Sequence, residues 1–203
     1  MAPTKTNGSH HKSGGRKLTA QPNFHQHAPE LQAFGTVELY PIGLEEVIRR
    51  EVCDKLNQLL ADTITLRDLY KKSHWQVSGP NFYQLHLLFD KHYGEQVEIV
   101  DGLAERIQML GGVSLAMGGD VAEATRIDRP PKGRELPAAQ ISRLLEAHEL
   151  ILEYAHEAAE RADKLGDDGT NDLIVSGVIR PNEMQVWFLV EHLVDVPTAT
   201  VEK

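Results

Sequence analysis

The chain has a single cysteine and no long apolar run. One cysteine, Cys53, excludes a disulfide framework within the chain and a cysteine-rich zinc site. No apolar stretch approaches the roughly 18 residues that a membrane-spanning helix requires. Residues 1–30 lack an apolar segment followed by a small-residue cleavage site, so we expect no secretory signal and a cytoplasmic location. G-x-S-x-G and phosphate-binding glycine motifs are also absent, which leaves nucleophilic catalysis without support.

Acidic residues are absent from the first 29 positions, although the whole chain carries a formal net charge of −9. These positions are rich in Gly, Ser, Asn, Pro and His, a composition that buries too little apolar surface to offset the entropy of ordering it. We therefore expect three parts: a mobile basic tail over residues 1–40, a folded body over residues 41–196 and a short tail over residues 197–203.

Proline and glycine are also absent between residues 44 and 77, where apolar residues recur at the steps of three and four that are typical of an amphipathic helix. The expected core positions of this helix are Ile48, Val52, Leu56, Leu59, Thr63, Leu66 and Tyr70. Gly79 and Pro80 end it, and a second helix is predicted over about residues 81–110. The apolar stripe of the second helix is predicted to run through Phe82, Leu85, Phe89, Tyr93, Val97, Val100, Ala104 and Ile107.

Residues 113–135 contain five glycines and prolines and are predicted to form a long crossover, with a short helix near residues 120–126. Two further helices follow over about residues 137–165 and 171–193, and Pro181 is expected to kink or restart the last one. No alternation typical of strands is present. The pattern therefore predicts an all-α fold, a ferritin-like four-helix bundle of two hairpins joined by the crossover.

Two histidines and an aspartate interrupt the apolar pattern near the first turn: His74, His86 and Asp90. His74 and His86 are equally distant from Pro80 in sequence, so an antiparallel hairpin places both imidazoles at one height, with Asp90 one helical turn beyond His86. Two imidazoles and a carboxylate form half of a site for a divalent transition metal. The other interpretation is that each histidine is an ordinary hydrogen-bonded core residue.

Two more carboxylates, Asp101 and Glu105, lie on one face of the second helix, roughly 22 Å further along it. One chain cannot bring both clusters to one metal. Two copies of the helix that cross antiparallel about a two-fold axis near residues 95 and 96 would pair His86 with Glu105 and Asp90 with Asp101. Gly94 beside that axis would let the two backbones approach. We therefore predict a metal site shared between two subunits.

Mixed nitrogen and oxygen ligation suits ferrous iron, and also zinc or manganese, so the donor set leaves the metal open. The alternative for the two carboxylates of the second cluster is an ordinary solvated helix face, where they pair with Arg106 or Lys91.

The sequence HWQVSGPNFYQLHLLFD, residues 74–90, followed by DGLAERIQMLGG, residues 101–112, closely resembles the signature of the Dps family, the DNA-binding proteins from starved cells. A weaker resemblance extends over about residues 40–195. The positions that the family uses at its ferroxidase centre between subunits are filled here by His74, His86, Asp90, Asp101 and Glu105.

The resemblance implies a hollow homododecamer built from two-fold dimers. Such a shell oxidises ferrous iron with hydrogen peroxide, and with oxygen more slowly, stores the ferric mineral and protects DNA from oxidative damage. Trp75, beside the site, also matches the family and could intercept stray radicals; its other interpretation is core packing.

The family takes up iron through acidic pores on three-fold axes, which implies Asp167, Asp168 and Asp172 as pore residues here. Gly169 stands where some relatives carry another acid. The other interpretation of this stretch is a solvated turn with helix capping by Thr170 or Asp172. The resemblance also implies DNA binding on the nucleoid, through phosphate contacts of the tail residues Lys5, Lys12, Arg16 and Lys17. The tail also contains four histidines, which either scavenge metal weakly or belong to a solvated linker: His10, His11, His25 and His27.

Related diiron proteins build their centre inside one bundle from two Glu-x-x-His motifs. This chain has one such motif, Glu153 to His156, so a centre within one subunit is disfavoured. His148, His156 and His192 are expected to be core or interface residues, with an extra ligand role left open. The rival function is a non-enzymatic protein that compacts DNA or forms a shell around a structural metal site.

Overall fold

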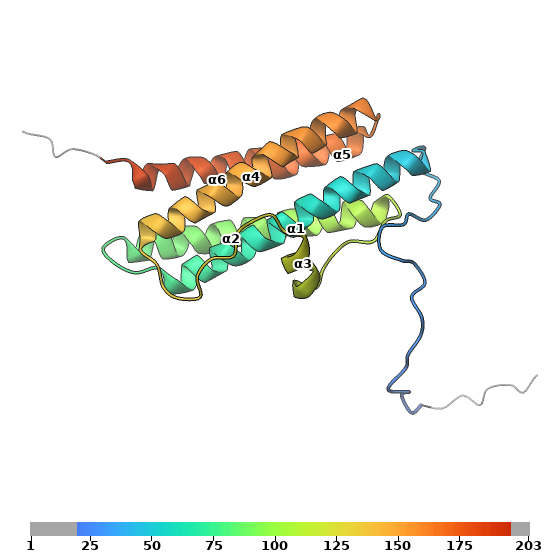
Figure 1. Ribbon diagram of the computed structural model, residues 1–203, viewed down its shortest axis with the longest axis horizontal. Coiled ribbons are helices and arrows are strands. Elements are labelled where there is room, and N and C mark those ends of the chain that lie inside the picture. The colour runs from blue at the N-terminus through green and yellow to red at the C-terminus, as the bar shows by residue number, and fades with distance from the viewer. Residues whose placement is uncertain (1–19, 196–203) are drawn as a thin grey trace, which may run out of the picture. The chain divides into compact units, whose positions relative to one another are not determined.

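The structure, a computed structural model, describes residues 20–195 (Figure 1). These residues are helical or irregular, and no strand occurs among them. The helices all belong to a compact unit that begins at Gln32, whereas residues 20–31 are irregular and belong to a separate unit. The predicted all-α fold class is confirmed. The basic residues assigned to DNA contacts, together with His10 and His11, lie outside the described residues.

The helices form two antiparallel hairpins (Figure 1). The first consists of α1 (Glu46–Gln76) and α2 (Phe82–Met109). The second pairs α4 (Pro137–Lys164) with a run of helical segments that follow one another directly. These segments are α5 (Asp168–Asp172), the π-helix η1 (Leu173–Ile179), α6 (Arg180–Val190) and the 3₁₀-helix η2 (Glu191–Leu193).

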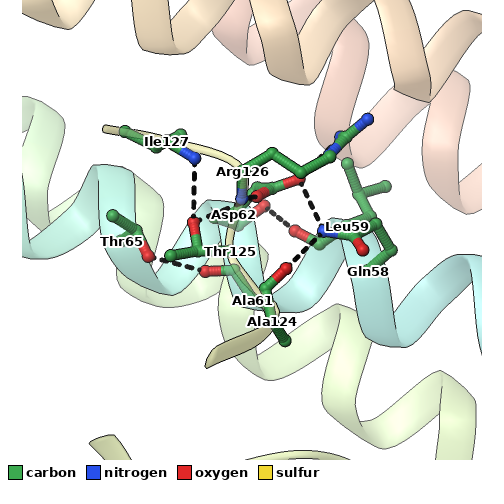
Figure 2. Close-up of polar contacts among 10 residues, drawn as sticks. Gln58, Leu59, Ala61, Asp62, Thr65, Ala124, Thr125, Arg126 and Ile127 are labelled. Carbon is green, nitrogen blue, oxygen red and sulfur yellow. Dashed lines mark hydrogen bonds and ion pairs between the residues drawn. The ribbon is translucent and has the colours of Figure 1, made fainter. Parts of the chain in front are cut away.

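A long crossover joins the two hairpins, so that α2 and α4 run in the same direction (Figure 1). It includes one short helix, α3 (Gly118–Ala124), close to the predicted place. The crossover is fixed to α1 by the buried carboxylate of Asp62, which accepts hydrogen bonds from Gln58, Thr125 and Arg126 (Figure 2). Because Asp62 is fully buried, these donors are what compensate its charge.

The core lies where the hairpins pack together. Fully buried apolar side chains from α1, α2 and α4 include Leu56, Leu59, Leu60, Leu66, Leu85, Phe89, Leu103, Ile107 and Ile141. The α1 stripe is as predicted, except that Ile48 is only partly buried. No helix among residues 20–195 is both long and apolar enough to cross a membrane.

The predicted stripe of α2 is partly wrong. Phe82 and Val97 are exposed, whereas His92 and Gln96 are buried. The buried face of α2 is rotated relative to the predicted one, because His92 and Gln96 contact polar partners inside the bundle. The apolar pattern alone therefore does not identify the buried face correctly. The apolar residues left outside are available to a second subunit.

The last helical run changes character at Pro181. The π-helix η1 passes directly into α6 at Arg180, so Pro181 lies in the first turn of a new α-helical segment, which agrees with the predicted restart. Proline has no backbone N–H to donate, so a hydrogen bond is missing wherever it stands inside a helix. The wider turns of the π-helix η1 directly precede Pro181, where this hydrogen bond is missing. Trp187 and Val190, two apolar residues of α6, are exposed.

Residues that were expected to belong to the tail contact the end of α2. The Glu38 N–H donates to the Gly111 carbonyl (2.8 Å), and the buried Arg49 donates to the Leu110 carbonyl (2.8 Å) and to Glu38. Gly111 has φ +82°, and an added Cβ would lie 2.7 Å from the Glu38 carbonyl oxygen, so only glycine fits at this stop of α2.

Candidate metal centre

His74, near the end of α1, and His86, near the start of α2, face each other at the turn of the first hairpin. The His74 Nδ1 atom lies 2.8 Å from the His86 carbonyl oxygen, and the His86 Nδ1 atom lies 2.9 Å from the His74 carbonyl oxygen. The rings are stacked, with their centroids 3.8 Å apart. The equal heights predicted from their distances to Pro80 are therefore present in the structure.

The reciprocal hydrogen bonds fix the tautomer of both rings. A carbonyl oxygen only accepts, so Nδ1 of each ring carries the proton and donates it. Both Nε2 atoms are then left with free lone pairs, which is the form in which imidazole binds a metal. His74 Nε2 lies 3.8 Å from Asp90 Oδ1, so a third donor is close.

Asp90 is held by Lys71, whose Nζ lies 2.6 Å from Asp90 Oδ1. This hydrogen bond is the main reason why the pKa of Asp90 lies below its usual value, and the charges of Lys71, His74 and His86 act in the same direction. The carboxylate is half exposed and ionised near neutral pH. It is therefore ready to bind a cation, although an ammonium group already contacts it.

The second cluster is open to solvent in the single chain. Asp101 and Glu105 are exposed, and neither forms a hydrogen bond or ion pair with any residue of the described range 20–195. The alternative pairing is wrong, because Arg106 binds Asp167 and Lys91 binds Glu95. Both carboxylates are thus free to contact another chain.

The described part of one chain does not complete a metal site. Among residues 20–195, no group of three or more His, Cys, Asp or Glu side chains is arranged to hold a metal ion. The surface of α2 between the two clusters is open at Gly94, where an added Cβ would meet no atom within 4 Å. Space for a second backbone therefore exists at the position that the predicted two-fold axis requires.

The three aspartates assigned to the pore have different environments. Asp167 is buried, pairs with Arg106 (2.5 Å) and caps α5 by accepting from the Thr170 N–H (3.0 Å). Asp168 and Asp172 are exposed. Only these two carboxylates remain open to solvent in the single chain. Helix capping does occur in this stretch, but the capping residue is Asp167 and not Thr170 or Asp172.

Trp75 is 70% exposed, so it is not part of the subunit core. Of the three further histidines, His148 is fully buried in the core, and His156 and His192 are exposed. His25 and His27 of the tail are exposed as well.

A buried polar network was not predicted from the sequence. The Tyr70 hydroxyl lies 2.5 Å from His148 Nε2 and 3.2 Å from His92 Nδ1, and Gln96 donates to both Asn182 and Gln185. Burial lowers the pKa of His92 to about 4 and that of His148 to about 3. The step of four between His92 and Gln96 was the available signal, but polar residues at helical spacing usually mark a solvated face.

Comparison with known proteins agrees with this fold. The family model of the ferritin-like domain matches residues 53–199, so the chain is a ferritin-like protein. The solved structure of DpsC from Streptomyces coelicolor is 55% identical and superposes with a TM-score of 0.83 over 85% of this chain and 100% of that one.

Two more distant relatives are informative. A Dps protein from Vibrio cholerae O1, described as a member of a broad superfamily of ferritin-like diiron-carboxylate proteins, is 27% identical with a TM-score of 0.72, over 80% of this chain and 99% of that one. The DNA protection during starvation protein of Agrobacterium fabrum is 29% identical over 68% of this chain and 85% of its own length. The chain belongs to the Dps family.

Proposed function

We propose that this protein oxidises ferrous iron with hydrogen peroxide, and with oxygen more slowly, at centres shared between two subunits of a dodecameric shell that stores the ferric mineral. One observation carries the proposal: the two reciprocal ring-to-carbonyl hydrogen bonds, which leave Nε2 of His74 and of His86 free beside Asp90. Two neutral imidazoles and a carboxylate are a donor set for ferrous iron.

The partner subunit would supply Asp101 and Glu105. Their exposure without a partner among residues 20–195, together with the open backbone at Gly94, supports a two-fold crossing of α2 with its copy. Three carboxylates per centre would largely neutralise one or two divalent ions, and zinc or manganese could take the same donors. Iron is the substrate here, and the chain positions it and excludes side reactions.

Iron entry and protection of DNA belong to the same proposal. Asp168 and Asp172 are exposed carboxylates beside the start of the last helix and would attract cations to a pore at a three-fold axis. The curated name of the Agrobacterium relative supports DNA protection. The four basic tail residues would bind DNA phosphates, and the binding would weaken steeply with salt.

The shared centre can be tested by mixing two inactive variants. His86→Ala removes a ligand from one half of the centre, and Glu105→Gln removes a ligand from the other half. In a mixed dimer, one centre receives both defects and the other receives none, so co-assembly of the two variants should restore about a quarter of the wild-type iron oxidation for random pairing. The measurement is the absorbance of ferric product after anaerobic ferrous loading and addition of peroxide.

A matched mixture controls for non-specific rescue. His86→Ala mixed with His74→Ala has both defects in the same half, so every centre of every mixed dimer is damaged and no activity should return. Native mass spectrometry would verify that mixed dimers form. Inactivity of His86→Ala plus Glu105→Gln despite mixed dimers would contradict the shared centre, and undiminished oxidation by each variant alone would favour a non-enzymatic shell.

A further inference from the structure

Tyr70 has a hydrogen-bonding environment that no other tyrosine of the chain shares. It is fully buried, and its hydroxyl oxygen lies 2.5 Å from Nε2 of the equally buried His148. On its other side, His92 Nδ1 lies 3.2 Å from the same oxygen. Both imidazoles contact the phenol ring edge-on, with centroids 5.2 and 5.7 Å away.

The direction of the hydrogen bond to His148 follows from the tautomer of that ring. Burial lowers the pKa of His148 to about 3 and raises that of Tyr70 well above its usual value, so the ring and the phenol are both neutral. His148 Nδ1 makes no hydrogen bond of good geometry with residues 20–195, although Asn182 lies near enough to raise the pKa of the ring. In the tautomer with the proton on Nδ1, Nε2 is the acceptor and the Tyr70 hydroxyl donates to an unprotonated base. This is the tautomer that the inference uses.

We propose that Tyr70 supplies one electron to the oxidant at the metal centre, while His148 accepts the phenolic proton. The inference rests on the proposed ferroxidase function. Tyr70 precedes His74 by four residues on α1, a rise of roughly 6 Å. The ring of Phe89, which directly precedes Asp90, has its centroid 6.3 Å from that of Tyr70. The phenol is thus one helical turn from the centre, yet it has no solvent access through which peroxide could reach it.

The chemistry requires such a donor whenever a centre holds a single ferrous ion. Hydrogen peroxide takes two electrons and two protons to become two water molecules, but one ferrous ion gives only one electron. Tyr70 gives the second: its O–H bond breaks, the proton moves to His148 Nε2, and a neutral tyrosyl radical and an imidazolium remain. Two protons from solvent complete the two waters. The peroxide is then fully reduced without release of hydroxyl radical.

The other tyrosines are less suited to this role. Lys71 Nζ lies 4.4 Å from the ring centroid of Tyr93, and Arg126 Cζ lies 4.3 Å from that of Tyr154. A cation over the ring opposes the loss of an electron from it. Tyr40 and Tyr83 are exposed and have no buried base. Trp75 is exposed too, so a radical formed there would meet solvent.

The test is freeze-quench electron paramagnetic resonance on the assembled protein. One ferrous ion per centre is mixed with peroxide, and the tyrosyl signal is compared among wild type, Tyr70→Phe and the control Tyr154→Phe. We expect the signal to be lost in Tyr70→Phe and kept in Tyr154→Phe. His148→Leu retains the phenol but removes the base, so it should also lose the signal. In wild type with ¹⁵N-labelled histidine, the radical should show an exchangeable proton shared with a histidine nitrogen.

The optical trace of iron oxidation, recorded on the same samples, separates the two proposals. No iron oxidation in wild type would mean that the proposed function fails. In that case a photogenerated ruthenium(III) tris-bipyridine oxidant, used without iron, still decides whether Tyr70 is the tyrosine that oxidises. A signal of unchanged yield in Tyr70→Phe would overturn the inference. If that variant does not assemble, the histidine coupling in wild type decides, and its absence would equally overturn it.

Discussion

The ammonium of Lys71 lies 2.6 Å from the Asp90 carboxylate, so a cation of the chain itself occupies part of the candidate metal centre. Lys71→Met removes this positive charge and leaves Asp90 for the metal alone. We expect cobalt(II), as a redox-inert substitute, to bind a few-fold more tightly, because an exposed ion pair contributes little and is easily displaced. Calorimetric titration measures this, with Lys91→Met as control, since Lys91 pairs with Glu95 instead. Weaker binding in Lys71→Met would show that the lysine supports the centre.

Gly94 is predicted to lie at the contact between two copies of α2. Gly94→Leu adds a side chain where the single chain has open space, and it removes an unfavourable helix residue, so the helix content of the subunit should be unchanged. The added side chain should block the close approach of the two helices and abolish both dimer formation and iron oxidation. Native mass spectrometry and circular dichroism measure these effects. Gly119→Leu on α3, also in open space, should assemble normally. Normal assembly of Gly94→Leu would place the contact elsewhere.

The fold was largely predictable because its helices are long and strongly periodic. The stop at Gly79 and Pro80 and the start of α4 at Pro137 agree with the structure within a few residues. The buried edge of α2 was not predictable, since His92 and Gln96 enter the core through partners on other helices. Periodicity shows that a helix has a buried face, but it does not show which polar residues find partners across the bundle.

The site was predictable in part for the same reason. Equal distances of His74 and His86 from Pro80 place both rings at one height, and the structure has them stacked. The position of the proton on each ring is set by a backbone carbonyl group of the facing helix. The identities of the side chains alone do not predict this contact. The burial of Asp167 was not predictable. It depends on the contact between Arg106 of α2 and the start of α5, and the sequence spacing of the aspartates does not indicate this contact.

Asp62 gives a prediction about stability. Arg126 donates two side-chain hydrogen bonds to its Oδ2 atom, at 3.0 and 2.6 Å (Figure 2). Arg126→Met leaves a fully buried carboxylate with fewer donors, so we expect a loss of about 2–3 kcal/mol. Thermal unfolding measures it. Arg50→Met removes an exposed pair with Glu46 and should cost at most about 1 kcal/mol. Equal effects of the two substitutions would mean that the burial of Asp62 carries no energetic cost.

The buried His148 makes the fold sensitive to acid. Its pKa falls from 6.5 to about 3 on folding, so the unfolded chain binds a proton at pH values where the folded chain does not. The stability associated with the neutral ring is complete above pH 6.5 and decreases as the pH falls below that value. At about pH 5 the loss should reach about 2 kcal/mol relative to neutral pH. His148→Gln does not titrate and can still accept a hydrogen bond from Tyr70, so its unfolding midpoint should change less between neutral and acidic pH. The control is His156→Gln at an exposed position, which should follow wild type. Parallel midpoints for wild type and His148→Gln across this range would show that folding does not lower the pKa of His148.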